Sequence, residues 1–395
     1  MHRPNDETIG SYDIDAEVKQ RYAAASAVPE ASLCCATSYA NPDLLKVLPD
    51  EIIEKDYGCG DPTPWARPGD TVLDLGSGGG KVCYILAQSV GETGSVIGVD
   101  FNDPMLELAR KHQGDIAEKI GYANTSFRKG KIQDLALDLD KANAWLAEHP
   151  IRTVDDVAAY DAECNRLRRE EPLVASDSVD LVVSNCVLNL VSPAEKAQLF
   201  GEIFRVLRKG GRAVISDVVS DEPVSQAILD DPVLWSGCIA GAFQEHEFLQ
   251  RFANAGFYGM EVLKRPDEAW QTIEGIEFRG VTVRAFKGKQ GKCFEHKQAV
   301  VYQGPWSQVR DDDGHTFFRG KRMAVCKKSY DLMTDPNGPY AGHMIGIEPR
   351  DAVDPADAKP FNCRTNAERS PRETKGLDYT VTKLVDDACC EPGCC

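Results

Sequence analysis

Cysteine is the residue type in this 395-residue chain that could carry unusual chemistry, since 14 cysteines are present. Thiolates are soft ligands for thiophilic ions, and thiol pairs can also transfer electrons. Two cysteines stand where a thiol would be presented to a ligand. Cys59 lies between two glycines in a predicted turn, and Cys186 follows a predicted buried strand. We therefore expect the turn to expose the Cys59 thiol, and both cysteines are candidates for binding or catalysis.

A glycine-rich loop is the second chemical feature. An apolar strand is predicted over residues 71–75, and the run GSGGG follows over residues 76–80. Glycines let the backbone turn with positive φ and let a ligand approach the chain closely. Asp100 closes the next predicted strand, where its carboxylate can accept hydrogen bonds from two ribose hydroxyls. The pattern indicates a cofactor that contains a nucleoside.

The glycine spacing decides between two cofactor classes. The dinucleotide fingerprint G-x-G-x-x-G needs a glycine at position 81, where this chain has Lys81. The stretch from Asp74 to Gly80 instead resembles the first motif of class I S-adenosylmethionine-dependent methyltransferases. Residues 130–134 (GKIQD) resemble their adenine-contacting motif. By this resemblance, the residues that bind S-adenosylmethionine are Asp74, Gly76, Ser77, Gly78, Gly80, Asp100, Phe101, Met105, Lys131, Ile132, Asn185, Cys186, Val187 and Asn189.

The elements that must position these residues alternate between strand and helix. Apolar runs predict five strands, at residues 71–75, 95–99, 125–127, 179–184 and 213–216. This alternation predicts a doubly wound, Rossmann-like α/β domain. Ligands of such sheets bind beyond the carboxyl ends of the strands, so Cys186 is expected to face the methyl donor.

Five regions are predicted along the chain. They are a helical segment with cysteines (1–60), the cofactor-binding domain with a helical insertion at 135–176 (61–230), an aromatic-rich cap (231–280), a β-rich domain (281–350) and a loop-like, cysteine-rich tail (351–395). Within the second region, residues 192–195 (SPAE) predict the capped start of a helix. The glycines at 210 and 211 are predicted to end that helix.

Several segments resemble, in order, those of the arsenite methyltransferases. They are residues 32–35 (SLCC), 57–60 (YGCG), 73–86, 183–190 (VSNCVLNL) and 233–242 (VLWSGCIAGA), within a resemblance that covers roughly residues 12–330. The insertion at 135–176 and residues 80–82 depart from the family pattern.

The resemblance implies roles for the cysteines. Cys59, Cys186 and Cys238 would bind arsenic, which makes region 231–280 an arsenic-binding cap. Cys34 would take part in a redox step with Cys59, and Cys35 is the alternative to Cys34.

The implied activity is transfer of methyl groups from S-adenosylmethionine to trivalent arsenic. Arsenite or methylated trivalent arsenic would be the substrate, and glutathione or thioredoxin the thiol reductant. Three soft thiolates suit trivalent arsenic and leave its lone pair free to accept a methyl group held at near-attack distance. Methylation formally oxidises arsenic, and a thiol pair such as Cys34 and Cys59 can reduce it again by forming a disulfide.

The other cysteines carry weaker signals. Cys83, Cys164, Cys293, Cys326 and Cys363 lie in no functional motif and are predicted to be packing residues. The tail cysteines leave three alternatives open, namely capture of arsenic, a four-thiolate zinc site, or no role. These tail cysteines are Cys389, Cys390, Cys394 and Cys395.

The overall charge and hydropathy exclude other functions. A formal net charge of −17 argues against binding to nucleic acids and to anionic membranes. No apolar run is long enough to span a bilayer, and the amino-terminal residues lack the apolar centre of a signal peptide. We therefore expect a cytoplasmic protein, and we also expect it to be a monomer. Two alternatives stay open: a methyltransferase for selenium or an organic thiol, and a metalloid-binding protein without turnover.

Overall fold

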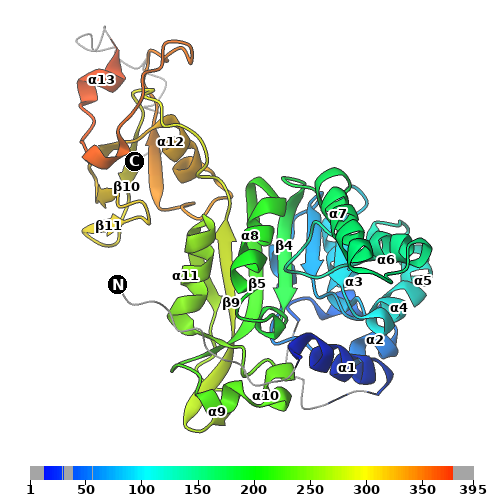
Figure 1. Ribbon diagram of the computed structural model, residues 1–395. Coiled ribbons are helices and arrows are strands. Elements are labelled where there is room, and N and C mark those ends of the chain that lie inside the picture. Colours follow the sequence, from blue (N-terminus) through cyan, green and yellow to red (C-terminus); the bar gives the residue numbers. More distant parts are fainter. Residues whose placement is uncertain (1–12, 29, 31–38, 56, 377–395) are drawn as a thin grey trace. The chain divides into compact units, whose positions relative to one another are not determined.

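The computed structural model describes residues 13–28, 30, 39–55 and 57–376. The chain divides into two compact units, one that ends at Gly288 and one that begins at Lys289. Figure 1 shows the course of both units in the colours of the sequence. Cys34, Cys35 and the four tail cysteines lie outside the described residues.

The first unit is built on one mixed sheet. Its main path has the strand order β3-β2-β1-β4-β5-β9-β7, while β6 pairs with β5 and β8 pairs with β9. The pairs from β3 to β5 are parallel, and β9 runs antiparallel to β5. The strands are β1 (Thr71–Leu75), β2 (Ser95–Asp100), β3 (Thr125–Lys129), β4 (Val179–Asn185), β5 (Leu207–Ser220), β6 (Phe243–Gln244), β7 (Tyr258–Lys264), β8 (Gln271–Ile273) and β9 (Ile276–Phe286).

Helices flank both faces of this sheet (Figure 1). Successive residues of β1 show why the strands are apolar throughout. Leu73 and Leu75 belong to one hydrophobic cluster, and Val72 belongs to another. Both faces of the strand are therefore buried, as expected for a parallel sheet. Together with the strand order and the helices on both faces, this burial confirms the predicted class I Rossmann-like fold. The helices of the first unit are α1 (Ile14–Ala27), η2 (Pro42–Leu45), α2 (Asp50–Glu54), η3 (Thr63–Trp65), α3 (Lys81–Val90), α4 (Asp103–Lys111), α5 (Gln113–Ile120), α6 (Leu139–Glu148), α7 (Val154–Glu170), η4 (Leu188–Leu190), α8 (Lys196–Val206), α9 (Gln226–Leu229), α10 (Pro232–Ser236) and α11 (Glu245–Ala255).

The start and the end of α8 differ from the sequence prediction. The helix begins at Lys196, because the Ser192 hydroxyl donates to the Glu195 carboxylate (2.8 Å) and does not cap the backbone. The helix ends at Val206, and β5 already contains both Gly210 and Gly211. Gly210 N–H donates to the carbonyl of Lys287 (2.7 Å), so the glycines extend the sheet instead of ending a helix.

The predicted boundary at residue 281 falls inside β9. This strand pairs with β5 along its length, from Phe278 opposite Ser220 to Phe286 opposite Arg212. The compact units divide only after Gly288. The predicted cap region also contributes β7 and the beginning of β9 to the main sheet, because their antiparallel pairing continues the sheet beyond β5.

The second unit contains two small sheets around its own core. One has the strand order β13-β10-β14, and the other pairs β11 with β12. Buried side chains such as Tyr302 and Phe317 form a separate hydrophobic cluster. The elements are β10 (Ala299–Tyr302), β11 (Gln308–Arg310), β12 (Thr316–Phe318), β13 (Arg322–Ala324), α12 (Lys327–Thr334), β14 (Met344–Ile347), η5 (Cys363–Thr365) and α13 (Pro371–Lys375).

Among the described residues, no helix combines the length and the apolar character that crossing a bilayer requires.

Candidate active site

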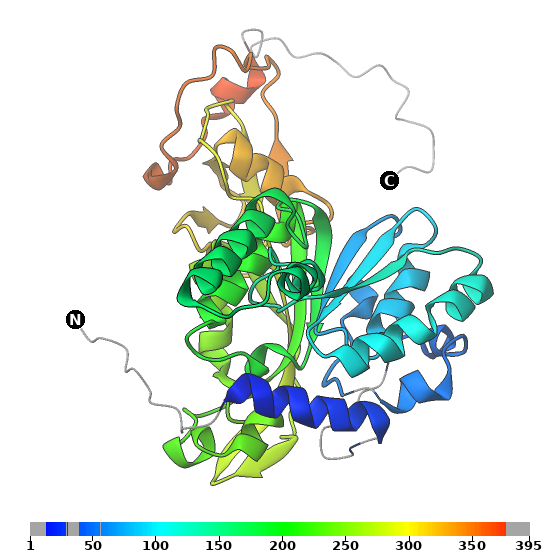
Figure 2. The same cartoon turned by 45° about the vertical axis from the view of Figure 1, so that its right-hand side comes forward.

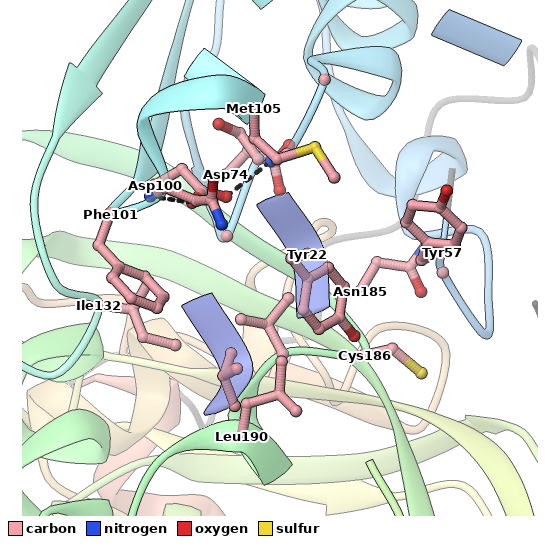
Figure 3. Close-up of a pocket in the computed structure, with 18 of the residues that line it drawn as sticks. Tyr22, Tyr57, Asp74, Asp100, Phe101, Met105, Ile132, Asn185, Cys186 and Leu190 are labelled. Carbon is pink, nitrogen blue, oxygen red and sulfur yellow. Dashed lines mark hydrogen bonds between the residues drawn. The ribbon is translucent and has the colours of Figure 1, made fainter. Parts of the chain in front are cut away.

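An open pocket lies beyond the carboxyl ends of β1, β2 and β4. Its volume is about 1080 Å³ when the space open to solvent is included. Figure 3 shows Asp100, Phe101 and Ile132 on one side of the pocket and Tyr57 and Cys186 on the other. Predicted cofactor residues that line the pocket are Asp74, Gly76, Ser77, Gly78, Asp100, Phe101, Met105, Lys131, Ile132, Asn185, Cys186 and Val187.

The Asp100 carboxylate ties the glycine loop to the end of β2. Its Oδ2 accepts a hydrogen bond from Gly78 N–H (2.9 Å), and its Oδ1 accepts one from Asn102 N–H (2.8 Å). Burial raises the pKa of Asp100, while these backbone donors act in the opposite direction. The carboxylate is thereby fixed at the pocket wall, with lone pairs left for the hydroxyls of a ligand.

The glycine loop leaves room that side chains would fill. Gly76 has a φ of +67°. A Cβ there would stand 2.5 Å from Val187 Cγ1, so only glycine fits. The neighbouring Ser77 Oγ is buried and makes no hydrogen bond to any described residue. A close backbone approach beside an unsatisfied hydroxyl fits a polar ligand such as S-adenosylmethionine.

Two predicted cofactor residues are placed elsewhere by the structure. Gly80, with a φ of +87°, precedes α3, where an added Cβ would meet the Phe127 ring. Asn189 is buried, and its amide donates to the carbonyls of Val218 (2.6 Å) and Cys238 (3.2 Å). Neither residue lines the pocket. Asn189 instead holds the backbone that carries Cys238.

The Asn185 side chain clamps the turn that presents Cys59. Its Oδ1 accepts hydrogen bonds from the N–H groups of Cys59 (2.8 Å) and Gly60 (3.0 Å), and its Nδ2 donates to the carbonyl of Gly60 (2.7 Å). A Cβ at Gly58 would stand 2.1 Å from this Nδ2. Gly58 thus allows the turn to pack against the end of β4, and Gly60 allows it to pack against Ser216 of β5.

Three cysteines from distant segments meet beside the pocket. Cys59 and Cys186 form a disulfide, with their Cα atoms 5.7 Å apart. The Cys238 thiol donates a hydrogen bond to the carbonyl of Cys186 (3.0 Å). Cys186 and Cys238 are buried, and only Cys186 of the three lines the pocket itself. The arrangement brings together the three cysteines to which the resemblance assigned arsenic.

The first helix forms part of the pocket wall, which the sequence did not indicate. Figure 2 shows α1 as a dark blue helix that runs across one end of the sheet. Val18 and Tyr22 line the pocket from this helix, and the Tyr22 hydroxyl lies 3.9 Å from Cys238 Sγ. Arg21 holds the helix in place, since it donates to the Val233 carbonyl (2.8 Å) and to the Ser236 hydroxyl (2.9 Å). The spacing of apolar residues in this helix was the only sequence signal, and it does not show which part of the protein the helix packs against.

A buried carboxylate supports the loop after Cys186. Asp217 Oδ2 accepts a hydrogen bond from Leu188 N–H (2.8 Å), and its Oδ1 accepts one from Val218 N–H (2.8 Å). Burial raises the pKa of Asp217 to about 7, although these donors and the Lys196 charge oppose the shift. Burial likewise lowers the pKa of Lys196 to about 8.

Comparisons with known proteins identify related folds and sequences. A family model described as a methyltransferase domain matches residues 66–171 and 160–256, and one described as a domain of unknown function matches residues 289–379. The crystal structure of an arsenic(III) S-adenosylmethionine methyltransferase from Chlamydomonas reinhardtii is similar, with a TM-score of 0.50 and 29% identity, over 85% of this chain and 100% of that one.

Curated relatives with similar sequences are arsenite methyltransferases. The chain is 33% identical to an arsenite methyltransferase of Aquipseudomonas alcaligenes over 330 residues, which cover 79% of this chain and 84% of the relative. It is 29% identical to an arsenite methyltransferase of Mus musculus over 365 residues, which cover 89% of this chain and 83% of that one.

The mixed sheet, the methyltransferase-domain match and the similar proteins identify the chain as a class I S-adenosylmethionine-dependent methyltransferase. The curated relatives identify the family within this class, because their sequences are similar to this chain over most of its length. The chain belongs to the arsenite methyltransferase family.

Proposed function

We propose that this protein transfers methyl groups from S-adenosylmethionine to trivalent arsenic that is bound by Cys59, Cys186 and Cys238. The observation that carries the proposal is the convergence of these thiols beside the pocket. Cys59 is bonded to Cys186, and Cys238 Sγ lies 3.0 Å from the Cys186 carbonyl oxygen.

The pocket residues have defined tasks toward the cofactor. When bound, S-adenosylmethionine supplies an electrophilic methyl group on a positively charged sulfonium. Asp100 accepts hydrogen bonds from ribose hydroxyls, and Ser77 gains the partner that its buried hydroxyl lacks. The glycine loop allows the close approach, because a side chain at Gly76 would collide with Val187.

The cysteines hold the substrate in the proposed reaction. Reduction of the Cys59–Cys186 disulfide by an external thiol such as glutathione or thioredoxin frees two of the three ligands. Arsenite then exchanges its three hydroxyl groups for three thiolates and releases three water molecules. Three-coordinate arsenic keeps a lone pair, which is the group that accepts the methyl.

The surroundings of two of the three thiols are apolar. Cys186 and Cys238 pack in one hydrophobic cluster with Trp235 and Phe278, both of which are buried. A sulfonium centre loses its positive charge as the methyl group leaves. An apolar wall therefore favours the transfer.

A redox step completes the proposed cycle. Methylation raises the formal oxidation state of arsenic by two. We propose that the Cys34 thiolate, after giving up its proton to solvent, attacks the arsenic-bound sulfur of Cys59. The Cys34–Cys59 bond forms, the As–S bond of Cys59 breaks and leaves its electron pair on arsenic, and the external thiol then reduces the disulfide. Replacing Cys34 by Ala should then allow a first methylation of arsenite or of monomethylated trivalent arsenic and stop the later rounds, because the arsenic is no longer reduced.

Turnover with arsenite tests the proposal. The protein, arsenite, S-adenosylmethionine and a thiol reductant should yield methylated arsenic by element-specific chromatography. Cys186→Ser should give none above the enzyme-free background. Cys164→Ser, which alters a buried thiol of α7 outside this site, should keep the wild-type rate. The absence of product at every thiol concentration would refute the proposal.

A further inference from the structure

A second cluster of three thiols lies in the unit that begins at Lys289. The sulfur atoms of Cys293, Cys326 and Cys363 lie within 4.8 Å of one another. They are all of the cysteines in residues 289–376, and none of the three forms a disulfide. Packing alone does not explain why every thiol of these residues meets at one point. An odd number of thiols also cannot be consumed by disulfide pairing.

Backbone contacts fix two of the thiols relative to each other. Phe361 N–H donates to the carbonyl of Cys293 (2.9 Å), and Glu295 N–H donates to the carbonyl of Lys359 (2.8 Å). These bonds pair the segment at 293–295 with the segment at 359–361. As a result, Cys363 is held close to Cys293.

The third thiol is fixed by the start of α12. Lys327 N–H donates to the carbonyl of Phe294 (3.0 Å), which ties this helix to the segment that contains Cys293. Cys326 caps α12, and its sulfur accepts a hydrogen bond from Ser329 N–H (3.4 Å). Cys326 is buried, whereas Cys293 and Cys363 are partly exposed. The cluster is thus rigid on one side and open to a small solute on the other.

A buried arginine stiffens the same region. The Arg369 guanidinium donates to both carboxylate oxygens of Glu295 (2.7 and 2.8 Å) and to Glu373 (3.0 Å). Nη2 makes both bonds to Glu295 and Nη1 makes the bond to Glu373, so one buried guanidinium links the two carboxylates through charge-assisted hydrogen bonds. The thiols therefore stand on a preformed frame, which lowers the entropic cost of binding an ion.

We propose that Cys293, Cys326 and Cys363 form a second binding site for trivalent arsenic. Thiolates select soft ions. Among the described residues, the cluster has three thiols and no fourth ligand, whereas structural zinc sites use four protein ligands. Three-coordinate arsenic needs only three, and its complex with three thiolates carries no net charge, which suits a partly buried site. The choice of arsenic as the ligand rests on the proposed function. The presence of the thiol cluster is independent of that function.

The binding step is an exchange of ligands without a change in oxidation state. Three S–H bonds and three As–O bonds break as arsenite enters. Three As–S bonds and three O–H bonds form, and three water molecules leave. The arsenic remains trivalent, and no external oxidant or reductant is consumed.

Protection of individual cysteines against alkylation tests the proposal. The reduced full-length chain is titrated with arsenite and pulsed with N-ethylmaleimide, and each cysteine peptide is then quantified by mass spectrometry. Cys293 and Cys363 should lose labelling together, at one half-maximal arsenite concentration. Cys363→Ser should raise that concentration at Cys293 at least tenfold. Cys164→Ser, the matched control for a thiol outside both clusters, should leave it unchanged.

Further measurements distinguish failure of the second arsenic site from failure of the proposed function. Protection at Cys293 and Cys363 should persist in Cys186→Ser, in which methylation is lost. Wild-type methylation without any protection of Cys293 and Cys363 would overturn the second site and leave the function standing. Protection without methylation would overturn the function alone. Protection by zinc chloride at lower concentrations than arsenite would also overturn the second arsenic site, because the cluster would then be a zinc site.

Discussion

The Cys238 thiol donates a hydrogen bond of 3.0 Å to the carbonyl of Cys186, and both residues hold left-handed backbone conformations, with φ values of +64° and +61°. A residue other than glycine in this region costs on the order of 1–3 kcal/mol. Two such residues lie in direct contact beside the pocket. We infer that the site holds their sulfur atoms in these positions for its function, although the backbone conformation lowers the stability of the folded state.

The backbone strain at Cys238 is measurable. We expect Cys238→Gly to be at least as stable as Cys238→Ala in chemical denaturation, because glycine adopts positive φ freely. At Cys164, inside helix α7, the order should reverse, with the glycine variant less stable by about 1 kcal/mol. A Cys238→Gly variant that is clearly less stable than Cys238→Ala would show that the strain is absent.

The Asn185 clamp should be required for the position of Cys59. Asn185→Ala removes three hydrogen bonds and leaves two backbone N–H groups of the turn without their acceptor. We expect a loss of roughly 2–3 kcal/mol of stability and slower formation of the Cys59–Cys186 disulfide, followed by mass spectrometry. Asn124→Ala, which removes hydrogen bonds to the carbonyls of Ala87 and Gly91, is the control and should not change the disulfide rate.

The glycine loop offers a test of cofactor binding. Gly76→Ala would place a Cβ 2.5 Å from Val187 Cγ1 in a residue that already has positive φ. We expect the affinity for S-adenosylmethionine, measured by calorimetry, to fall at least about tenfold, which corresponds to about 1.4 kcal/mol. Gly121→Ala shares the positive φ but meets no atom within 4 Å, so its affinity should equal that of the wild type. Equal affinities for the two variants would contradict the proposed binding of S-adenosylmethionine against the glycine loop.

Asp217 should make stability depend on pH. Its carboxyl is buried with a pKa of about 7, whereas its ordinary value is 3.8. Between these values the folded state holds a proton that the unfolded state has lost. The contribution of Asp217 to stability is therefore present below pH 4 and is lost as pH rises toward 7, by at most about 1.4 kcal/mol per pH unit.

Comparison with Asp217→Asn isolates this contribution. The free energy of unfolding of the wild type minus that of the variant should fall steadily from pH 4 to pH 7, as measured by urea denaturation at each pH. A difference that is constant or rises over this range would show that the carboxyl is ionised in the folded state.

Local patterns predicted the parts of the site that lie on one strand or loop. The strand over residues 71–75, the glycine loop and Asp100 stand where the sequence indicated, because periodicity and glycine spacing are local signals. The pairing of β9 with β5 and the packing of α1 over the pocket were not predictable, since each depends on contacts between distant segments.

The cysteines likewise fall into those that local sequence motifs identify and those that only the folded structure brings together. Those in recognisable motifs, such as Cys59 and Cys186, could be identified from neighbouring residues. Cys293, Cys326 and Cys363 were expected to be packing residues, because no short motif links them, yet the second unit brings them together. Sequence reasoning could not detect a cluster that arises from tertiary folding alone. The expected start of α8 was wrong for a local reason, namely that Ser192 and Glu195 bond to each other.

The position of arsenic in the first site tests the central claim most directly. A crystal structure of the reduced protein soaked with arsenite, with anomalous scattering recorded at the arsenic edge, locates the ion without ambiguity. Our account predicts an arsenic atom within bonding distance of the sulfurs of Cys59, Cys186 and Cys238. Arsenic that is bound without Cys186, or that is absent from this site while these thiols are reduced, would contradict the account.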